Sequence, residues 1–200
     1  MMDVKEMKID AMSLSAHKIY GPKGIGALYI KNDINVARFM HGGHQERNKR
    51  AGTVNVAGAV GFGAATETAI RDSSINGARL KGLRDYMIMQ IEQNIENAKL
   101  NGHRSQRLPN NVNFSFSGVE GESILVMLDF AGIAVSTGSA CSSGTLQRSY
   151  VLTAMGVSDE LNQGSIRFSL GRNTTKEEID YVVAELVKAI KKLRSMSAVR

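Results

Sequence analysis

Residues 15–24 read SAHKIYGPKG, and they join two short stretches with strand character. Residues 12–18 are typical of a strand that runs into a turn, and residues 27–30 are typical of a second strand after that turn. At the end of the first strand, the Ser15 hydroxyl and the His17 imidazole can bind phosphate oxygens, and the Lys18 amine can form a Schiff base. The segment predicts a strand–turn–strand unit with the parts of a cofactor site, although a Gly-Pro-Lys-Gly turn also occurs without one.

The composition is that of an ordinary globular protein. Of the 200 residues, 42% are hydrophobic and 22% are charged, which allows one core or two small lobes. The single cysteine, Cys141, excludes an intrachain disulfide and suits a reducing compartment. We find no run of about 18 apolar residues, and the N-terminus lacks the basic flank and apolar core of a signal peptide. We therefore expect a cytoplasmic protein without membrane contact.

The net charge of +6, with a pI near 9.5, raises the question of nucleic-acid binding. The basic residues are dispersed, aromatic residues make up 6% of the chain, and tryptophan is absent. The aromatic interleaving typical of single-strand binding modules is therefore missing. We expect no direct nucleic-acid contact, and the basic surface suits docking of an acidic protein instead.

Residues 41–53 form a loop rich in glycine and charge that ends in Gly52-Thr53. His41 and His44 could suggest a metal site, but no further cysteine or acidic cluster completes a tetrahedral ligand set. A basic loop that ends in a glycine and a hydroxyl is better explained as a place where backbone amides and Thr53 meet an anion.

Helical periodicity dominates the middle of the chain. Residues 56–70 give a loose apolar stripe with several glycines, residues 72–74 interrupt it, and residues 80–95 give a clearer packing helix. That helix is expected to leave Arg84 largely outside the core. The stretch 97–111 is expected to be a loop, and we place a lobe boundary near Ser73.

The remaining residues alternate between strands and helices. The pattern predicts strands at 112–116 and 133–135, a helix at 122–130, a helix at 150–155 capped by Ser149, and a last helix opened by a capping box at 174–178. In the strand predicted at 165–170, Arg167 lies on the face opposite Ile166 and Phe168. An arginine mounted in this way can clamp a carboxylate with two parallel hydrogen bonds, although an edge-strand arginine in water is the alternative.

Cys141 lies in the stretch 136–144, STGSACSSG. Free cysteine is most often buried, but these small polar neighbours favour an accessible loop. An accessible thiolate there suits a nucleophile that reaches a substrate and then a partner.

Taken together, the motifs at 15–24, 42–53, 139–142 and 166–172 resemble the cysteine desulfurases that feed iron–sulfur cluster assembly. These are class V aminotransferase-like enzymes that depend on pyridoxal 5'-phosphate, and the motifs occur in the family's order. The resemblance implies an α/β fold, the C-terminal part of a fold type I, aspartate-aminotransferase-like transferase. Residues 1–73 would then be the truncated end of the large pyridoxal-phosphate-binding domain and its sheet, and residues 74–200 an α+β small domain.

The resemblance also assigns roles. Lys18 would hold the cofactor and move a proton, Ser15 and His17 would bind its phosphate, and Thr53 would reach the phosphate of the neighbouring subunit in a homodimer. Arg167 would bind the carboxylate of L-cysteine. Cys141 would take its sulfur as a persulfide, release L-alanine, and pass the sulfur to an acceptor such as an iron–sulfur scaffold or a tRNA-thiolating enzyme.

Some implications of the resemblance stay open. No resident metal is expected. A role of Cys141 as a transient ligand of an iron–sulfur cluster is the alternative. The family's N-terminal half is absent, with the groups that face the cofactor ring, and Arg148 stands where relatives often have proline. The alternatives are an inactive remnant of such an enzyme, or another class V enzyme such as a selenocysteine lyase or an aminotransferase.

Overall fold

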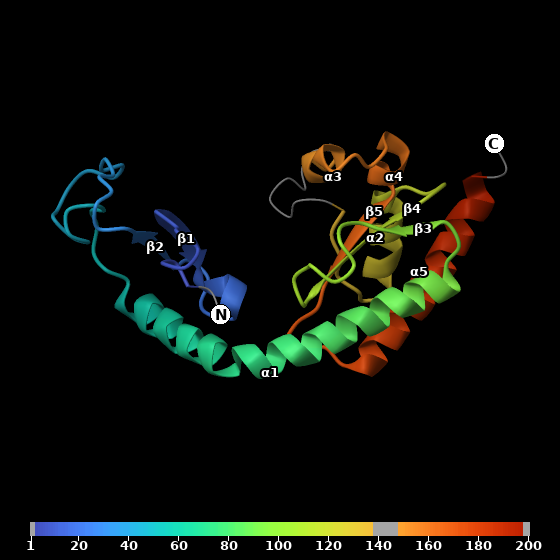
Figure 1. The fold of residues 1–200 in the computed structure, drawn as a ribbon, viewed down its shortest axis with the longest axis horizontal. Coiled ribbons are helices and arrows are strands. Elements are labelled where there is room, and N and C mark those ends of the chain that lie inside the picture. The colour runs from blue at the N-terminus through green and yellow to red at the C-terminus, as the bar shows by residue number, and fades with distance from the viewer. Residues whose placement is uncertain (1–2, 138–147, 198–200) are drawn as a thin grey trace. The chain divides into compact units, whose positions relative to one another are not determined.

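The computed structural model describes residues 3–137 and 148–197, and Figure 1 shows its elements. The chain divides into two compact units, Met1–Ile75 (unit 1) and Asn76–Arg200 (unit 2). The division falls inside helix α1 (Val56–Asn94), so each unit holds part of that helix. The assignment of residues 1–73 to a pyridoxal-phosphate-binding domain and of residues 74–200 to a small domain stays a prediction.

Unit 1 contains the predicted strand–turn–strand segment. Strands β1 (Ala11–Ser15) and β2 (Gly26–Ile30) pair antiparallel, with Ala11 opposite Ile30 and Ser15 opposite Gly26. A short 3-10 helix, η1 (Ala16–Ile19), lies between them. The prediction of two strands around a glycine-rich turn is confirmed, but residues 16–18 lie in η1 rather than in the first strand.

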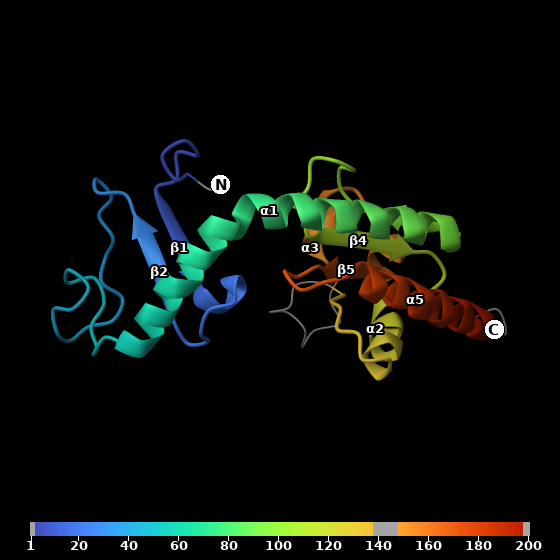
Figure 2. The same cartoon turned by 90° about the horizontal axis from the view of Figure 1, so that it is seen from below.

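Unit 2 is built on an antiparallel sheet of order β3-β4-β5, formed by β3 (Ala98–Leu100), β4 (Asn111–Phe116) and β5 (Ser165–Ser169). Alternation of side chains gives the sheet one apolar and one polar face. The apolar face packs against α1, α2 (Gly121–Phe130) and α5 (Lys176–Ser197), and Figures 1 and 2 show α1 and α5 next to each other. The sheet contributes five buried side chains to this core: Val112, Phe114, Phe116, Ile166 and Phe168.

Local capping signals set the ends of the helices in unit 2. The Ser149 hydroxyl accepts a hydrogen bond from the Leu152 amide at the start of α3 (Tyr150–Ala154). Before α5, the Glu178 amide donates to the Thr175 hydroxyl, and the Glu178 carboxylate accepts from the Thr175 amide. This reciprocal pair is a capping box. Both predicted helix starts are confirmed.

Several predictions about secondary structure are wrong. Helix α1 continues through residues 72–74, where the Ser73 hydroxyl donates to the Ile70 carbonyl, 2.9 Å away, and so bonds within the helix. Strand β3 lies in the expected loop, since its pairing with β4 comes from tertiary structure. Residues 133–135 form no strand; only Ser136 makes an isolated bridge. Helix α4 (Asp159–Gln163) was not predicted.

Arg84 was expected to lie outside the core, yet it is only 1% exposed. Its Nη1 atom donates to the carbonyl oxygens of Arg107 and Leu108, and its Nε and Nη2 donate to Asp85. These partners satisfy the guanidinium and allow its burial. Across residues 3–137 and 148–197, no helix is both long and apolar enough to cross a membrane.

Candidate functional site

The predicted cofactor lysine lies on η1, directly after β1. Lys18 and His17 are exposed, and Ser15 at the helix start is half-buried. Within the described part of the chain, none of these three side chains makes a hydrogen bond or an ion pair. A hydroxyl, an imidazole and an amine are thus grouped within four consecutive residues, with their polar atoms free to bind a ligand.

Close packing fixes the turn that carries Lys18. Ala16 is fully buried, and Tyr20 adopts a left-handed φ of 66° while its amide donates back to the Ala16 carbonyl. A Cβ atom on Gly21 would lie 3.0 Å from the Ala16 Cβ and 3.1 Å from that of Ala65, so a larger residue would force the turn or α1 to shift. The backbone under the lysine is therefore well defined.

Thr53 lies at the end of the basic loop, just before α1, and its side chain is exposed. Arg38 organises the loop, because its guanidinium donates to the carbonyl oxygens of Asn48 (2.8 Å) and Gly42 (3.2 Å). The Gly52 amide donates to the Gln45 side chain at 3.3 Å. The hydroxyl of Thr53 has no hydrogen-bond partner among residues 3–137 and 148–197.

The chemistry of these side chains fits pyridoxal phosphate. Its aldehyde requires an amine, which Lys18 offers, and its phosphate requires neutral or cationic donors, which Ser15, His17 and Thr53 offer. None of the four is engaged elsewhere in the described residues, so binding would break no existing interaction. Unit 1 therefore offers the types of hydrogen-bond donor and the amine that this cofactor requires.

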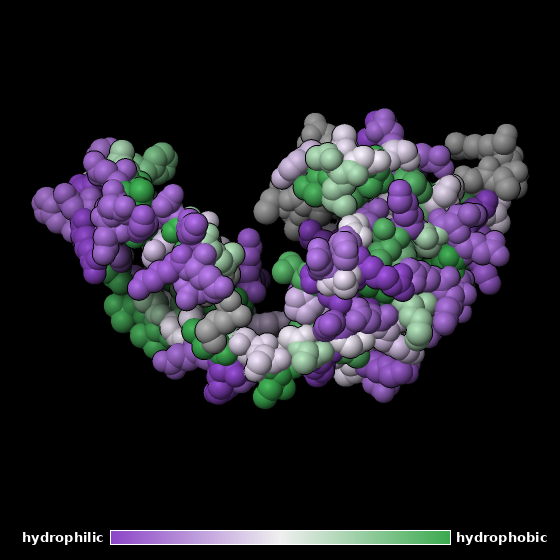
Figure 3. All heavy atoms as spheres, in the orientation of Figure 1, coloured by the Kyte–Doolittle hydropathy of each residue, from purple (hydrophilic) through white to green (hydrophobic). Residues whose placement is uncertain are grey.

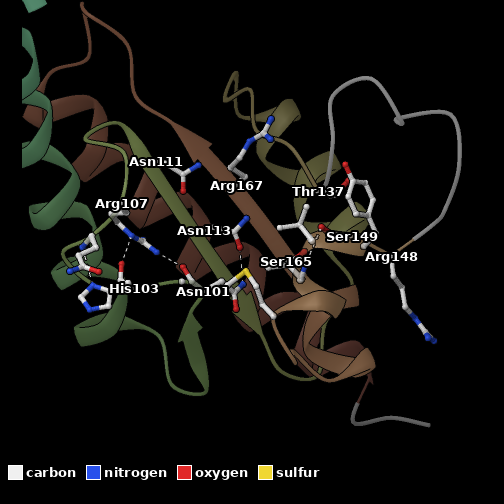
Figure 4. Close-up of a pocket in the computed structure, with 16 residues that line it drawn as sticks. Asn101, His103, Arg107, Asn111, Asn113, Thr137, Arg148, Ser149, Ser165 and Arg167 are labelled. Carbon is white, nitrogen blue, oxygen red and sulfur yellow. Dashed lines mark hydrogen bonds between the residues drawn. The ribbon is translucent and has the colours of Figure 1, made fainter. Parts of the chain in front are cut away.

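Unit 2 contains a cavity of about 510 Å³ on the polar face of its sheet, shown in Figure 4. Among the residues that the structure describes, its lining includes three arginines and one histidine, but no aspartate or glutamate. Arg148 is paired with Asp159 at 2.5 Å. Burial and the neighbouring Arg84 cation lower the pKa of the Arg107 guanidinium. The wall thus offers positive charge and favours an anionic ligand.

Arg167 lies on β5 as predicted, on the polar face, while Ile166 and Phe168 are buried on the other. Its side chain lines the cavity and is half-buried. Its Nε atom is buried and has no hydrogen-bond partner among the described residues. A buried donor without a partner is destabilising until a ligand satisfies it.

The backbone of Arg167 is joined to the segment that leads toward Cys141. The Arg167 amide donates to the Ser136 carbonyl at 2.7 Å, and the Ser136 amide donates back at 3.2 Å. Thr137 and Arg148, on either side of residues 138–147, both line the cavity. Cys141 lies outside the described residues, so its accessibility stays a prediction.

A network of asparagines in this cavity was missed by sequence reasoning. The Asn101 side chain donates from Nδ2 to the Asn113 carbonyl oxygen (2.7 Å) and to the Ser115 hydroxyl (2.8 Å). The alternation in β4 already placed Asn113 and Ser115 opposite the buried phenylalanines. The link to Asn101 depends on the pairing of β3 with β4, which no local pattern shows.

Residues 1–182 match the family model of class-V aminotransferases, and the chain belongs to that family, whose members depend on pyridoxal phosphate. The cysteine desulfurase IscS of Dictyoglomus turgidum is 55% identical over 196 residues, covering 98% of this chain and 50% of that protein. IscS of Clostridium botulinum (strain Hall) is 53% identical over 198 residues, again covering 98% and 50%. The chain thus spans about half the length of the curated relatives it matches.

Solved structures show the same relationship. A NifS-like protein superposes with a TM-score of 0.85 at 32% identity, covering 96% of this chain and 49% of that one. A NifS-like protein from Rickettsia africae gives 0.82 at 27% identity, covering 97% and 50%. The predicted α/β fold and pyridoxal-phosphate family are confirmed. The placement of the chain in the C-terminal half rests on its motifs and stays a prediction.

Proposed function

We propose that this chain is the part of a cysteine desulfurase that binds L-cysteine and takes up its sulfur. The observation that carries the proposal is the 55% identity to IscS over 98% of the chain. The cavity supports it, because in the described part of the chain Arg167 has an unpartnered Nε and no acidic side chain lines the cavity, which suits the carboxylate of an amino acid. A further structural neighbour, described as SspA in complex with cysteine, is 29% identical with a TM-score of 0.64.

In this proposal, Lys18, Ser15, His17 and Thr53 hold pyridoxal phosphate, Thr53 from the adjacent subunit of a homodimer. When bound, the cofactor supplies the electron sink that lets the substrate Cα–H and C–S bonds break. The Lys18 amine binds the cofactor and moves the proton at the substrate Cα. Ser15 and His17 donate hydrogen bonds to the phosphate and so set its orientation.

Arg167 binds the carboxylate of L-cysteine, and Cys141 acts as the nucleophile. The Cys141 thiolate attacks the substrate sulfur, an S–S bond forms, and the C–S bond breaks with its electron pair kept by the substrate. Protonation of the former Cβ gives L-alanine. The sulfur is oxidised to the persulfide level while the carbon is reduced, so no external oxidant is required. The persulfide then passes to an acceptor protein for iron–sulfur clusters or tRNA thiolation.

An inactive piece of such an enzyme is the second candidate. The observation in its favour is that unit 1, which carries Lys18, buries only two apolar side chains among residues 3–75, Ala16 and Ala51. A turn that carries a catalytic amine needs a rigid surrounding to hold a cofactor in register. The two candidates differ in whether the chain needs a complementary half.

The test is to purify the chain alone and together with a separately expressed complementary half of a relative. Alanine and sulfide are measured from L-cysteine, and mass spectrometry looks for a persulfide on Cys141. We expect turnover and persulfide only in the two-part sample, with both lost in Cys141→Ser. Brief alkylation of the folded chain should modify Cys141. No persulfide in either sample would exclude the desulfurase and leave the inactive piece.

A further inference from the structure

Asn113 and Arg167 face each other across the central strand pair of unit 2. In the antiparallel pairing of β4 with β5, Asn113 lies directly opposite Arg167. Residues so placed lie on the same face of a sheet, with Cβ atoms about 4.5–5.5 Å apart. Both side chains line the cavity, and Figure 4 shows them on neighbouring strands.

A hydrogen bond from Asn101 orients the side-chain amide of Asn113. Asn101, which is 5% exposed, donates from Nδ2 to the Asn113 Oδ1 at 2.7 Å. Since Oδ1 is the acceptor in this bond, the Nδ2 group of Asn113 is left as the free end of the amide. In Figure 4 the Asn113 nitrogen lies on the side away from Asn101. Within residues 3–137 and 148–197, this nitrogen has no hydrogen-bond partner.

Donors from two neighbouring strands therefore line one cavity, where the Asn101 Oδ1 is a buried acceptor without a partner among the described residues. Within residues 3–137 and 148–197, the Arg167 Nε is buried and unpartnered, and no aspartate or glutamate lines the cavity. A carboxylate has two oxygens and about four lone-pair sites, so it can accept from an arginine and an amide at once. An amide beside the arginine adds a direction that a single cation lacks, since it fixes the plane of the carboxylate.

We propose that Asn113 is a second carboxylate-binding residue, which with Arg167 selects a ligand that carries a free carboxylate. The inference rests on the proposed role of Arg167 and deepens it. Asn101 is a positioning residue that presents the Asn113 Nδ2 group to the cavity. The substrate class is thereby restricted to free α-amino acids. Cysteamine, and a cysteine whose carboxyl group is in a peptide bond, are excluded because they lack the free carboxylate.

The test uses the whole 200-residue chain without added cofactor, and its probes are propionate and the neutral propionamide. Binding is followed by NMR through the Arg167 side-chain Nε–H signal or, in variants of Arg167, through the Asn113 amide. We expect propionate, but not propionamide, to give saturable shifts. Asn113→Ala should weaken propionate binding about tenfold, the effect of losing one hydrogen bond to a charged group.

Asn113→Asp is the sharper variant, because it keeps the acceptor for Asn101 and replaces the free donor by a carboxylate that pairs with Arg167. Saturable propionate binding should disappear while the melting temperature stays unchanged. The matched control, Asn110→Ala, removes an asparagine outside the cavity lining and should bind as the unchanged chain does.

The outcomes separate this inference from the proposed function. If Arg167→Lys weakens propionate binding and Asn113→Asp does not, Asn113 is excluded and the role of Arg167 stands. If neither variant changes propionate binding, or if propionate does not bind the unchanged chain, the inference about Asn113 and the proposed role of Arg167 are both overturned.

Discussion

The two units differ sharply in what their secondary structure encloses. In unit 2, the apolar face of the sheet and three helices share one continuous core. In unit 1, among residues 3–75, only Ala16 and Ala51 are buried apolar side chains. Both units have paired strands and helical residues, so both have regular backbone hydrogen bonds. Only unit 2 also buries a core of apolar side chains, and this burial is what drives folding.

Unit 1 instead leaves large apolar side chains at the surface. Phe39 is 94% exposed, and Val56 and Val60 are 67% and 68% exposed. Figure 3 shows hydrophobic residues at the surface over the N-terminal part of α1. Apolar surface of this kind marks an interaction site or an aggregation liability. The segment with Lys18, the proposed cofactor lysine, is therefore formed by local contacts, whereas the cavity with Arg167 lies on a sheet that covers a core.

The largest expected effect is a difference in hydrogen exchange between the units. Amides in β1 and β2 should exchange through local opening close to zero free energy, whereas those in β4 should require opening by about 5 kcal/mol or more. Native-state exchange read by NMR or mass spectrometry measures both. Equal protection of the two strand pairs would show that unit 1 has a stability its side-chain burial does not explain.

Truncation of a core side chain should come next in size. Phe114 is fully buried on β4, and Phe114→Ala should lower the free energy of unfolding by about 3–5 kcal/mol through lost burial and a cavity. Its counterpart in unit 1 is Val60→Ala, which should change stability by about 0.5 kcal/mol or less. Denaturant unfolding of both variants provides the comparison, and similar losses would contradict the proposed asymmetry.

Helix α1 carries two ion pairs between an arginine and the aspartate that follows it, one in each unit, and they allow a direct comparison. Arg84, paired with Asp85 at 2.7 Å, is buried in unit 2, and Arg71, paired with Asp72 at 2.8 Å, is exposed in unit 1. Arg84→Met should destabilise by about 2–3 kcal/mol, because the part-buried carbonyl oxygens of Arg107 and Leu108 lose their donor. Arg71→Met should leave unfolding unchanged within error. An unaffected Arg84→Met variant would show that water replaces the guanidinium.

Local signals in the sequence predict much of this fold. The β1–β2 pair follows from strand residues around a glycine turn, and the starts of α3 and α5 follow from Ser149 and from the Thr175–Glu178 box. These features depend on residues within a few positions of each other. The continuity of α1 through residues 72–74 and the existence of β3 could not be predicted in this way. Residues 72–74 have a polar, turn-like composition although they are helical, and β3 depends on its pairing with β4.

The candidate site shows the same limit. The sequence places Arg167 on the polar face of its strand, since the alternation with Ile166 and Phe168 is local. It does not show that Asn113 lies opposite, because strand register joins residues 54 positions apart (167 minus 113). The burial of Arg84 likewise depends on the distant carbonyls of Arg107 and Leu108.

The smallest expected effect is a pH dependence in unit 2. Asp180 on α5 accepts from the Tyr86 hydroxyl at 2.5 Å and pairs with Lys176 at 3.0 Å. The Tyr86 hydrogen bond, followed by the Lys176 hydrogen bond, lowers the pKa of Asp180 below its ordinary value. A carboxyl group with a lowered folded-state pKa stabilises the protein above its unfolded pKa of about 4, and the contribution is lost as the pH falls through the folded value.

The Asp180→Asn variant should therefore melt slightly below the unchanged chain at pH 7 and at pH 5, and the gap should close below about pH 4. Thermal unfolding followed by circular dichroism at these pH values measures it. The control in unit 1 is Asp33→Asn, which removes an exposed partner of Lys31, 3.0 Å away. Because the cooperative core lies in unit 2, this change should leave the transition unaltered at every pH, although the Asp33 pKa is also lowered by Lys31. A gap for Asp180→Asn that stays constant down to pH 3 would mean that the carboxylate charge does not stabilise the α1–α5 contact.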